Sequence, residues 1–179
     1  MDLLAWKARF GAIVVSIAAA LGLGLIVAPG AGATTGNADS TVSGIGGPEL
    51  SLAVATPAAL TLTHAAPATS TSLVTVTSTS PSWTLSISDD DVSGSGTPGY
   101  MDNVNCITHA LLGGSLLNAL EWSNNGGSTY NALSSTPATV KAGSLIDTQT
   151  VTYRQSLGAS EAVGAGDCYE LTTTYTVTG

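Results

Sequence analysis

Carboxylates gather in one short segment of the chain, and their spacing could support metal chemistry. Three consecutive aspartates, Asp89, Asp90 and Asp91, are followed after a glycine-rich stretch by Asp102. Carboxylate oxygens are preferred ligands of Ca²⁺, which takes about six to eight of them. The segment lacks the ligand spacing of an EF-hand. A calcium site and a solvated acidic turn, in which aspartate bonds to its own backbone, are therefore both open.

Two histidines, His64 and His109, are the candidates for a general base. A Ser-His-Asp triad needs a histidine that touches a nucleophile and is oriented by a carboxylate. The sequence has neither a Gly-x-Ser-x-Gly elbow nor a His-Glu-x-x-His motif. Asp102 and Glu121 could form the carboxylate pair of a glycosidase, although no motif marks them. These observations predict that the protein is not an enzyme.

Positive charge is scarce, which excludes one large class of partners. The 179 residues carry a formal net charge of −8, with 4 Lys and Arg against 12 Asp and Glu. Beyond residue 33, Lys141 and Arg154 are the only such bases. A nucleic-acid surface needs clustered Lys and Arg to neutralise phosphates. The composition therefore excludes nucleic acid as a partner, while 44% hydrophobic residues suffice for a folded core.

The N-terminus has the layout of a secretory signal peptide. A basic start precedes 19 uncharged residues, 10–28, which are rich in Ala, Leu, Ile and Val, and Pro29 follows them. Small residues at Ala31 and Ala33 are typical of a cleavage site after Ala33. We expect residues 1–33 to form a helical signal peptide that is removed on export. The alternative is an uncleaved membrane anchor, since a span needs about 20 apolar residues.

The two cysteines, Cys106 and Cys168, are expected to form a disulfide. Export exposes the chain to an oxidising compartment, where disulfides form and persist. The bond would close a loop of about 60 residues and contribute about 4 kcal/mol to stability. Two separate thiols remain the alternative. A zinc site would need about four ligands, and two cysteines with two distant histidines do not have the usual spacing.

Hydrophobic periodicity predicts a β domain after a short leader. Residues 34–47 are mostly Gly, Ser, Thr, Asn and Asp, a composition typical of a flexible leader. In residues 48–179, apolar and hydroxyl side chains alternate in short runs separated by Gly and Pro turns. We therefore expect residues 48–179 to form an all-β domain, an antiparallel two-sheet sandwich of the immunoglobulin-like type. The clearest runs are 50–55, 60–63, 74–77, 83–88, 151–155 and 169–177.

Three more specific expectations follow from the same pattern. The last two runs, 151–155 and 169–177, are expected to pair as antiparallel strands of one sheet. A short helix is an option at residues 106–113, where Gly113 would end it. Large apolar and aromatic side chains within the strands should anchor the core. They are Trp83, Trp122, Tyr153, Leu171 and Tyr175.

The run 82–88, Ser-Trp-Thr-Leu-Ser-Ile-Ser, follows an expected strand and precedes the aspartate-rich loop. Together with residues 117–122, 151–155 and 165–177, this layout resembles the WxL-type surface domains of Gram-positive bacteria and is similar to secreted sandwich domains of actinobacteria. The triplet 83–85 matches the first Trp-x-Leu motif, and Tyr-Thr-Val at 175–177 stands where the second would be. The resemblance implies a non-catalytic domain held noncovalently at the cell envelope.

We therefore expect a secreted, acidic, Thr-rich and non-catalytic module at the cell surface. Its partner would be a cell-wall polymer or a surface protein, with no cofactor other than the calcium considered above. It would touch the membrane only through an uncleaved signal segment. The alternative function is a self-assembling, pilin-like subunit of a fibre or matrix, in which residues 34–47 complete a neighbour's sheet edge. A secreted hydrolase is the third choice.

Overall fold

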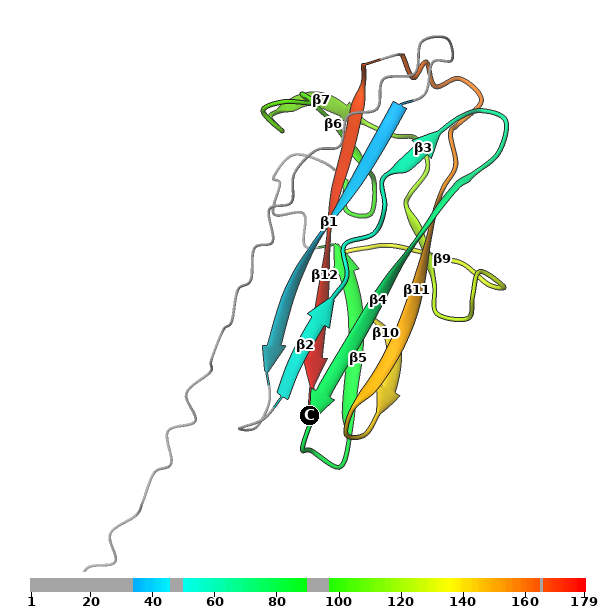
Figure 1. The fold of residues 1–179 in the computed structure, drawn as a ribbon. Helices are drawn as coiled ribbons and strands as arrows, with labels where there is room; N and C mark the ends of the chain where they lie inside the picture. The colour runs from blue at the N-terminus through cyan, green and yellow to red at the C-terminus, as the bar shows by residue number, and fades with distance from the viewer. Residues whose placement is uncertain (1–33, 46–49, 90–96, 165) are drawn as a thin grey trace, which may run out of the picture.

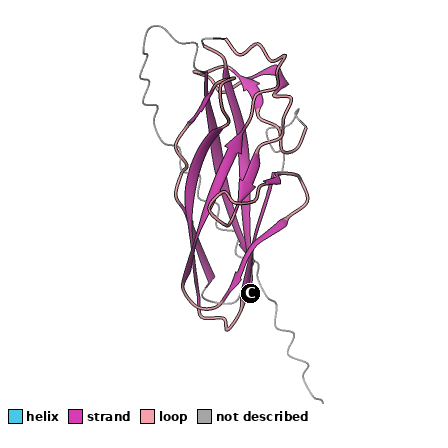
Figure 2. Cartoon of the chain, turned by 90° about the vertical axis from the view of Figure 1, so that its right-hand side faces the viewer, coloured by secondary structure: helices cyan, strands magenta, loops and turns pink. Residues whose placement is uncertain are grey.

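The computed structural model describes residues 34–45, 50–89, 97–164 and 166–179, and for 34–45 it describes the backbone alone (Figure 1). Every regular element within these residues is a β-strand, and the strands form two packed layers (Figure 2). The expected all-β sandwich is therefore confirmed. The expected signal helix lies outside the described residues. No helix in the described part of the chain could span a membrane.

The first sheet has seven strands, and its main order is β10-β5-β12-β1-β3. A short hairpin, β6–β7, adds to it through β6, which pairs with the start of β12. All of these pairings are antiparallel except that of β1 with β12. The strands are β1 (Thr34–Ile45), β3 (Leu60–Leu62), β5 (Trp83–Asp89), β6 (Asp102–Val104), β7 (Leu111–Ser115), β10 (Ala138–Gly143) and β12 (Cys168–Thr178).

The second sheet has five strands in the order β2-β4-β11-β8-β9, and every pairing in it is antiparallel. Its centre is the long pair β4–β11, whose outer face is lined with threonines at alternate positions. These threonines extend the hydroxyl face that the sequence predicts. The strands are β2 (Leu50–Val54), β4 (Ala68–Ser78), β8 (Glu121–Ser123), β9 (Asn131–Ala132) and β11 (Asp147–Gln155).

The segment expected to be a flexible leader differs from that expectation. Thr34–Ile45 forms strand β1 and pairs in parallel with β12 from Thr35, opposite Cys168, to Ile45, opposite Thr178. Local composition does not favour a strand here, because Gly and Asn have low β-propensity. A long strand at a sheet edge, however, offers a row of backbone donors and acceptors that can order such a segment.

The expected pairing of residues 151–155 with 169–177 is wrong, because β11 and β12 belong to different sheets. They face each other across the core, where the hydroxyls of Tyr153 and Tyr175 form a hydrogen bond of 2.5 Å. Burial raises the pKa of Tyr153 to about 12 and also raises the pKa of Tyr175. Both hydroxyls therefore stay protonated at neutral pH and link the two sheets.

All five expected core anchors are buried, so this expectation is confirmed. Trp83 is 3% exposed, and its indole Nε1 donates to the carbonyl of Leu145 at 3.1 Å. Leu85, next on the same face of β5, is fully buried. Alternation along the long strands β4, β5, β11 and β12 places most of their apolar side chains between the sheets, which is the physical basis of the sandwich.

Residues 106–113 form no helix, contrary to the option raised from the sequence. They span the turn of the β6–β7 hairpin and most of β7. Gly113 and Gly114 both have positive φ, at +89° and +86°, a backbone region that glycine enters without steric cost. The glycine pair therefore shapes β7, where an α-helix would require negative φ throughout.

Candidate functional site

The β6–β7 hairpin pairs with the part of the β12 edge that β5 leaves unpaired. Strand β5 pairs with β12 at Thr173–Thr178, and β6 takes over the same edge at Cys168–Glu170. Because β6 pairs with only these residues of β12, the hairpin extends beyond the main body of the sandwich. Figure 1 shows it at the upper end of the molecule, opposite the end where the C-terminus lies.

A disulfide fastens this hairpin to β12. Cys106 lies two residues after the end of β6, Cys168 is the first residue of β12, and the two Cα atoms lie 5.3 Å apart. The expected pairing is therefore present. It joins positions 62 residues apart in the sequence. The covalent link fixes the loop after β6 against the sheet, so the hairpin does not depend on its few backbone pairs alone.

We call residues 105–112 the hairpin tip, and Asn105 organises its turn. Its Oδ1 accepts hydrogen bonds from the backbone N–H groups of Ile107 and Thr108, both at 2.9 Å. Its carbonyl accepts from the N–H of His109 at 2.9 Å, and its own N–H donates to Ala110 at 2.8 Å. These are the local side-chain bonds that asparagine makes in turns.

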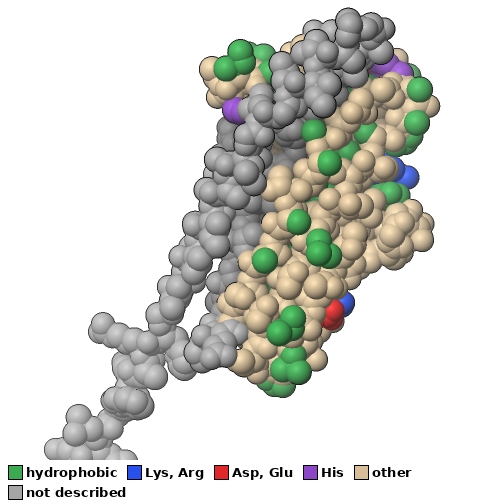
Figure 3. Space-filling view, in the orientation of Figure 1, with side chains coloured by type: hydrophobic (Ala, Val, Ile, Leu, Met, Phe, Trp, Pro, Cys, Tyr) green, Lys and Arg blue, Asp and Glu red, His purple; other side chains and the backbone are tan. Residues whose placement is uncertain are grey.

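The hairpin tip exposes aliphatic side chains. Ile107 is 84% exposed and Leu112 is 64% exposed, although both are residues that usually lie in a core. Apart from His109, residues 103–120 include no ionisable side chain other than the disulfide-bonded Cys106. Figure 3 shows hydrophobic side chains gathered at this projecting end. Exposed apolar groups on a rigid support are typical of contact sites.

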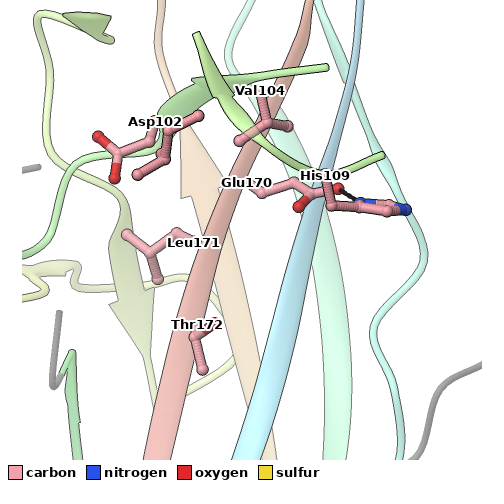
Figure 4. A pocket seen from close by; sticks show the side chains of 7 residues that line it. Asp102, Val104, His109, Glu170, Leu171 and Thr172 are labelled. Carbon is pink, nitrogen blue, oxygen red and sulfur yellow. Dashed lines mark hydrogen bonds and ion pairs between the residues drawn. The ribbon is translucent and has the colours of Figure 1, made fainter. Parts of the chain in front are cut away.

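A pocket of about 190 Å³ lies between the hairpin and β12 (Figure 4). On one side His109 Nδ1 lies 2.5 Å from Glu170 Oε1. On the other, the Ser115 hydroxyl donates to Asp102 Oδ1 at 2.6 Å. The lining residues are Asp102, Val104, His109, Leu111, Glu170, Leu171 and Thr172.

The two carboxylates of this pocket are direct neighbours across the strands, since Glu170 is in register with Asp102. Like charges at such positions repel each other. Each carboxylate has its own partner, His109 for Glu170 and Ser115 for Asp102. In Figure 4 the Asp102 carboxylate points away from the His109–Glu170 pair. The Glu170 and Asp102 carboxylates therefore interact with different groups, and the Ser115 hydroxyl is hydrogen-bonded to Asp102.

Lys141 and Arg154, the Lys and Arg residues beyond residue 33, each form an ion pair. Lys141 Nζ lies 2.9 Å from Asp147 Oδ2, and its hydrogen bond lowers the pKa of that carboxyl. Arg154 Nε donates to Glu121 Oε2 at 2.7 Å, and its guanidinium stacks 3.8 Å from the Tyr130 ring centroid. Neither Lys141 nor Arg154 lines the pocket. The pocket is therefore locally acidic, with the carboxylates of Asp102 and Glu170 in its lining.

The calcium candidates do not converge among the described residues. Asp89 is buried and accepts a hydrogen bond from the Gly99 N–H at 2.5 Å, whereas Asp102 is bonded to Ser115. Asp90 and Asp91 lie outside the described residues. In the described ranges no group of three or more His, Cys, Asp or Glu side chains could hold a metal ion.

The other residues with potential chemistry have different partners. Glu121, on β8 in the second sheet, accepts from Arg154, whereas Asp102, on β6 in the first sheet, accepts from Ser115. His64 is exposed in the loop between β3 and β4. The structure thus brings together His109 and Glu170. Glu170 was not selected from the sequence, because no pattern connects residues 61 positions apart.

Comparisons with known proteins add no family. No protein-family model matches the chain, and no curated protein matches it significantly. The geometry of the hairpin and its surroundings therefore carries the functional argument.

Proposed function

We propose that the protein is an exported, non-catalytic module that binds a partner at the cell surface through the hairpin tip. The observation that carries the proposal is the exposure of Ile107 and Leu112 on a hairpin fastened to β12 by the Cys106–Cys168 disulfide. A rigid support lowers the entropy that a contact loses on binding, and apolar anchors supply its affinity.

Export is supported by the disulfide together with the signal-like N-terminus. Disulfides persist in oxidising compartments outside the cytoplasm. The WxL-like resemblance points to the same location, and its triplet lies in β5, where Trp83 and Leu85 are core residues. An acidic surface with both bases paired is suited to remaining soluble outside the cell.

A binding role is favoured over catalysis by the pairing of the polar groups. His109 faces Glu170, while Ser115 donates its hydroxyl to Asp102, so the histidine and the hydroxyl have different partners. A serine nucleophile needs its proton directed to a base such as histidine. We infer instead that His109 and Glu170, which line the pocket beside the hairpin tip, form hydrogen bonds with the bound partner.

Of the two expected kinds of partner, we favour a surface protein over a cell-wall polymer. The exposed anchors are aliphatic, and residues 103–120 contain no aromatic side chain. An exposed apolar patch with polar groups at its rim marks protein contact sites, and an aliphatic side chain can serve as the anchor that fills a partner's pocket. The pocket beside His109 and Glu170 would then accept a polar side chain of the partner.

The test measures binding of the exported protein to isolated cell envelopes. We expect Ile107→Ser with Leu112→Ser to lower envelope binding at least about tenfold, since two buried anchors are lost. The matched control is Ile146→Ser, which changes a 70% exposed isoleucine in the β10–β11 turn at the far end. Equal binding by the tip variant and the control contradicts the proposal.

The same assay separates the two kinds of partner. Pretreating the envelopes with a protease should abolish binding if the partner is a protein. Binding that survives protease but is lost after digestion of the wall polymer would assign the tip to the polymer instead.

A further inference from the structure

Strand β1 is held to the sandwich almost entirely from one side. Its residues Thr35–Ile45 are in register with Cys168–Thr178 of β12 along the whole length of that strand. Within the described part of the chain, its other edge is paired only at Thr34–Gly36, with β3. Most of β1 is therefore a sheet edge, and Figure 1 shows it running beside β12.

The sequence of β1 adds little apolar bulk at the positions that matter for the core. The core-side row of β12 contains large side chains such as Tyr169, Leu171 and Tyr175, all buried. Among the β1 residues in register with this row, valine is the only large apolar residue. These β1 residues are Gly36, Ala38, Ser40, Val42 and Gly44. What the structure shows of the attachment of β1 is its backbone ladder, with β12 along Thr35–Ile45 and with β3 at Thr34–Gly36.

Strand β12, in contrast, requires a neighbour on that edge. Without one, its N–H and C=O groups would lie unpaired beside a buried core, which is costly and leaves an edge open to other strands. A backbone ladder can be formed equally by the same strand from another molecule. Exchange of an identical element between copies needs no new contacts.

The connection of β1 to the rest of the chain favours exchange. Four residues, 46–49, separate the end of β1 in one sheet from the start of β2 in the other. Short hinges are among the features that favour exchange. In this structure β1 pairs with β12 of its own chain, and the same ladder can form with β12 of another copy.

We propose that β1 is exchanged between copies of this chain, so that β1 of one molecule pairs in parallel with β12 of another. The partner is a second copy, and the contact is the β1–β12 ladder described above. The assembly goes beyond the proposed function and is independent of it, because the hairpin tip takes no part in the ladder. It corresponds to the fibre or matrix alternative raised from the sequence.

Crosslinking between two differently marked copies tests the exchange. Ser43 of β1 is in register with Thr176 of β12, so Ser43→Cys in one full-length chain and Thr176→Cys in another mark the two sides. The two chains are co-expressed, recovered after export and treated with a short bismaleimide. We expect a covalent product of twice the monomer mass, with a yield that rises with protein concentration.

The matched control combines Ser43→Cys with Thr77→Cys, an exposed threonine on β4 in the other sheet. This pair should give no product above background. A chain with both Ser43→Cys and Thr176→Cys reports the internal pairing. If it crosslinks fully within itself while the mixed copies give no dimer, exchange is contradicted.

A longer connector distinguishes exchange from simple side-by-side contact. Inserting a flexible Gly-Ser segment after residue 46 lengthens the hinge and favours pairing of β1 with its own β12 over exchange, so the dimer yield should fall severalfold. An unchanged yield would mean that the crosslink forms without strand exchange and would overturn the proposal. Envelope binding by the hairpin tip should be the same in either result.

Discussion

Replacing both Cys106 and Cys168 with serine is expected to lower the free energy of unfolding by about 4 kcal/mol. The bond joins residues 62 positions apart, so its loss increases the conformational entropy of the unfolded chain. For a domain of this size, such a loss is a large part of the total stability. The hairpin would also keep only its short β6 pairing with β12.

Urea unfolding with and without a reductant measures this effect. The midpoint of the wild-type protein should fall when reductant is added. The double serine variant serves as the control, since reductant should leave its midpoint unchanged. An equal midpoint for the oxidised wild type and the serine variant would contradict the stabilising role of the bond. Faster proteolysis within residues 105–112 after reduction would show that the hairpin tip has loosened.

The second large effect is expected at Gly99, which links three parts of the sandwich. Its N–H donates to the buried Asp89 carboxylate at 2.5 Å, and its carbonyl accepts from the Leu120 N–H at 2.7 Å. Its φ is +89°, and an added Cβ would collide with the backbone carbonyl of Leu133. Gly99→Ala should therefore destabilise the fold by about 3 kcal/mol, from backbone strain and overpacking together.

Gly114→Ala is the matched control for this substitution. Its φ of +86° is nearly the same as that of Gly99, but an added Cβ would meet nothing within 4 Å. It should cost about 1 kcal/mol, from the backbone conformation alone. Thermal or urea unfolding of the two variants separates conformational strain from collision. Equal losses of stability would mean that the contact with Leu133 does not constrain the Gly99 junction.

Alternation along the chain predicted the faces of the strands well. Trp83 and Leu85 on β5, and Leu171 and Tyr175 on β12, lie in the core as their spacing indicates. Periodicity reports which side chains share a face, but it contains no information about which strands are neighbours. For this reason β11 and β12 were expected in one sheet, although Tyr153 and Tyr175 meet between two sheets.

Other features were missed because they depend on partners distant in sequence. Segment 34–45 has little apolar alternation, and its strand is ordered by the edge of β12. The β6–β7 hairpin has strands of three and five residues, too short for periodicity to identify. The sequence does contain one signal for the exposed hairpin tip. In residues 103–120, aliphatic residues without Asp, Glu, Lys or Arg neighbours accompany a disulfide-bonded cysteine.

The candidate site could be predicted only in part. Asp102, His109 and both cysteines drew attention through their chemistry, and the disulfide pairing follows from export and the cysteine count. Glu170 resembled one more polar residue on the outer face of a strand. Its role as the partner of His109 depends on the turn at Asn105, which brings the imidazole back over β12.

Export of the folded protein is tested most directly by its location and by the state of its thiols. Cells that express the full-length chain can be separated into cytoplasm, envelope and medium, and a thiol-alkylating reagent then applied to each fraction before and after reduction. We expect the protein in the envelope fraction or the medium, with both cysteines alkylated only after reduction. Folded protein in the cytoplasm with both thiols free would contradict export.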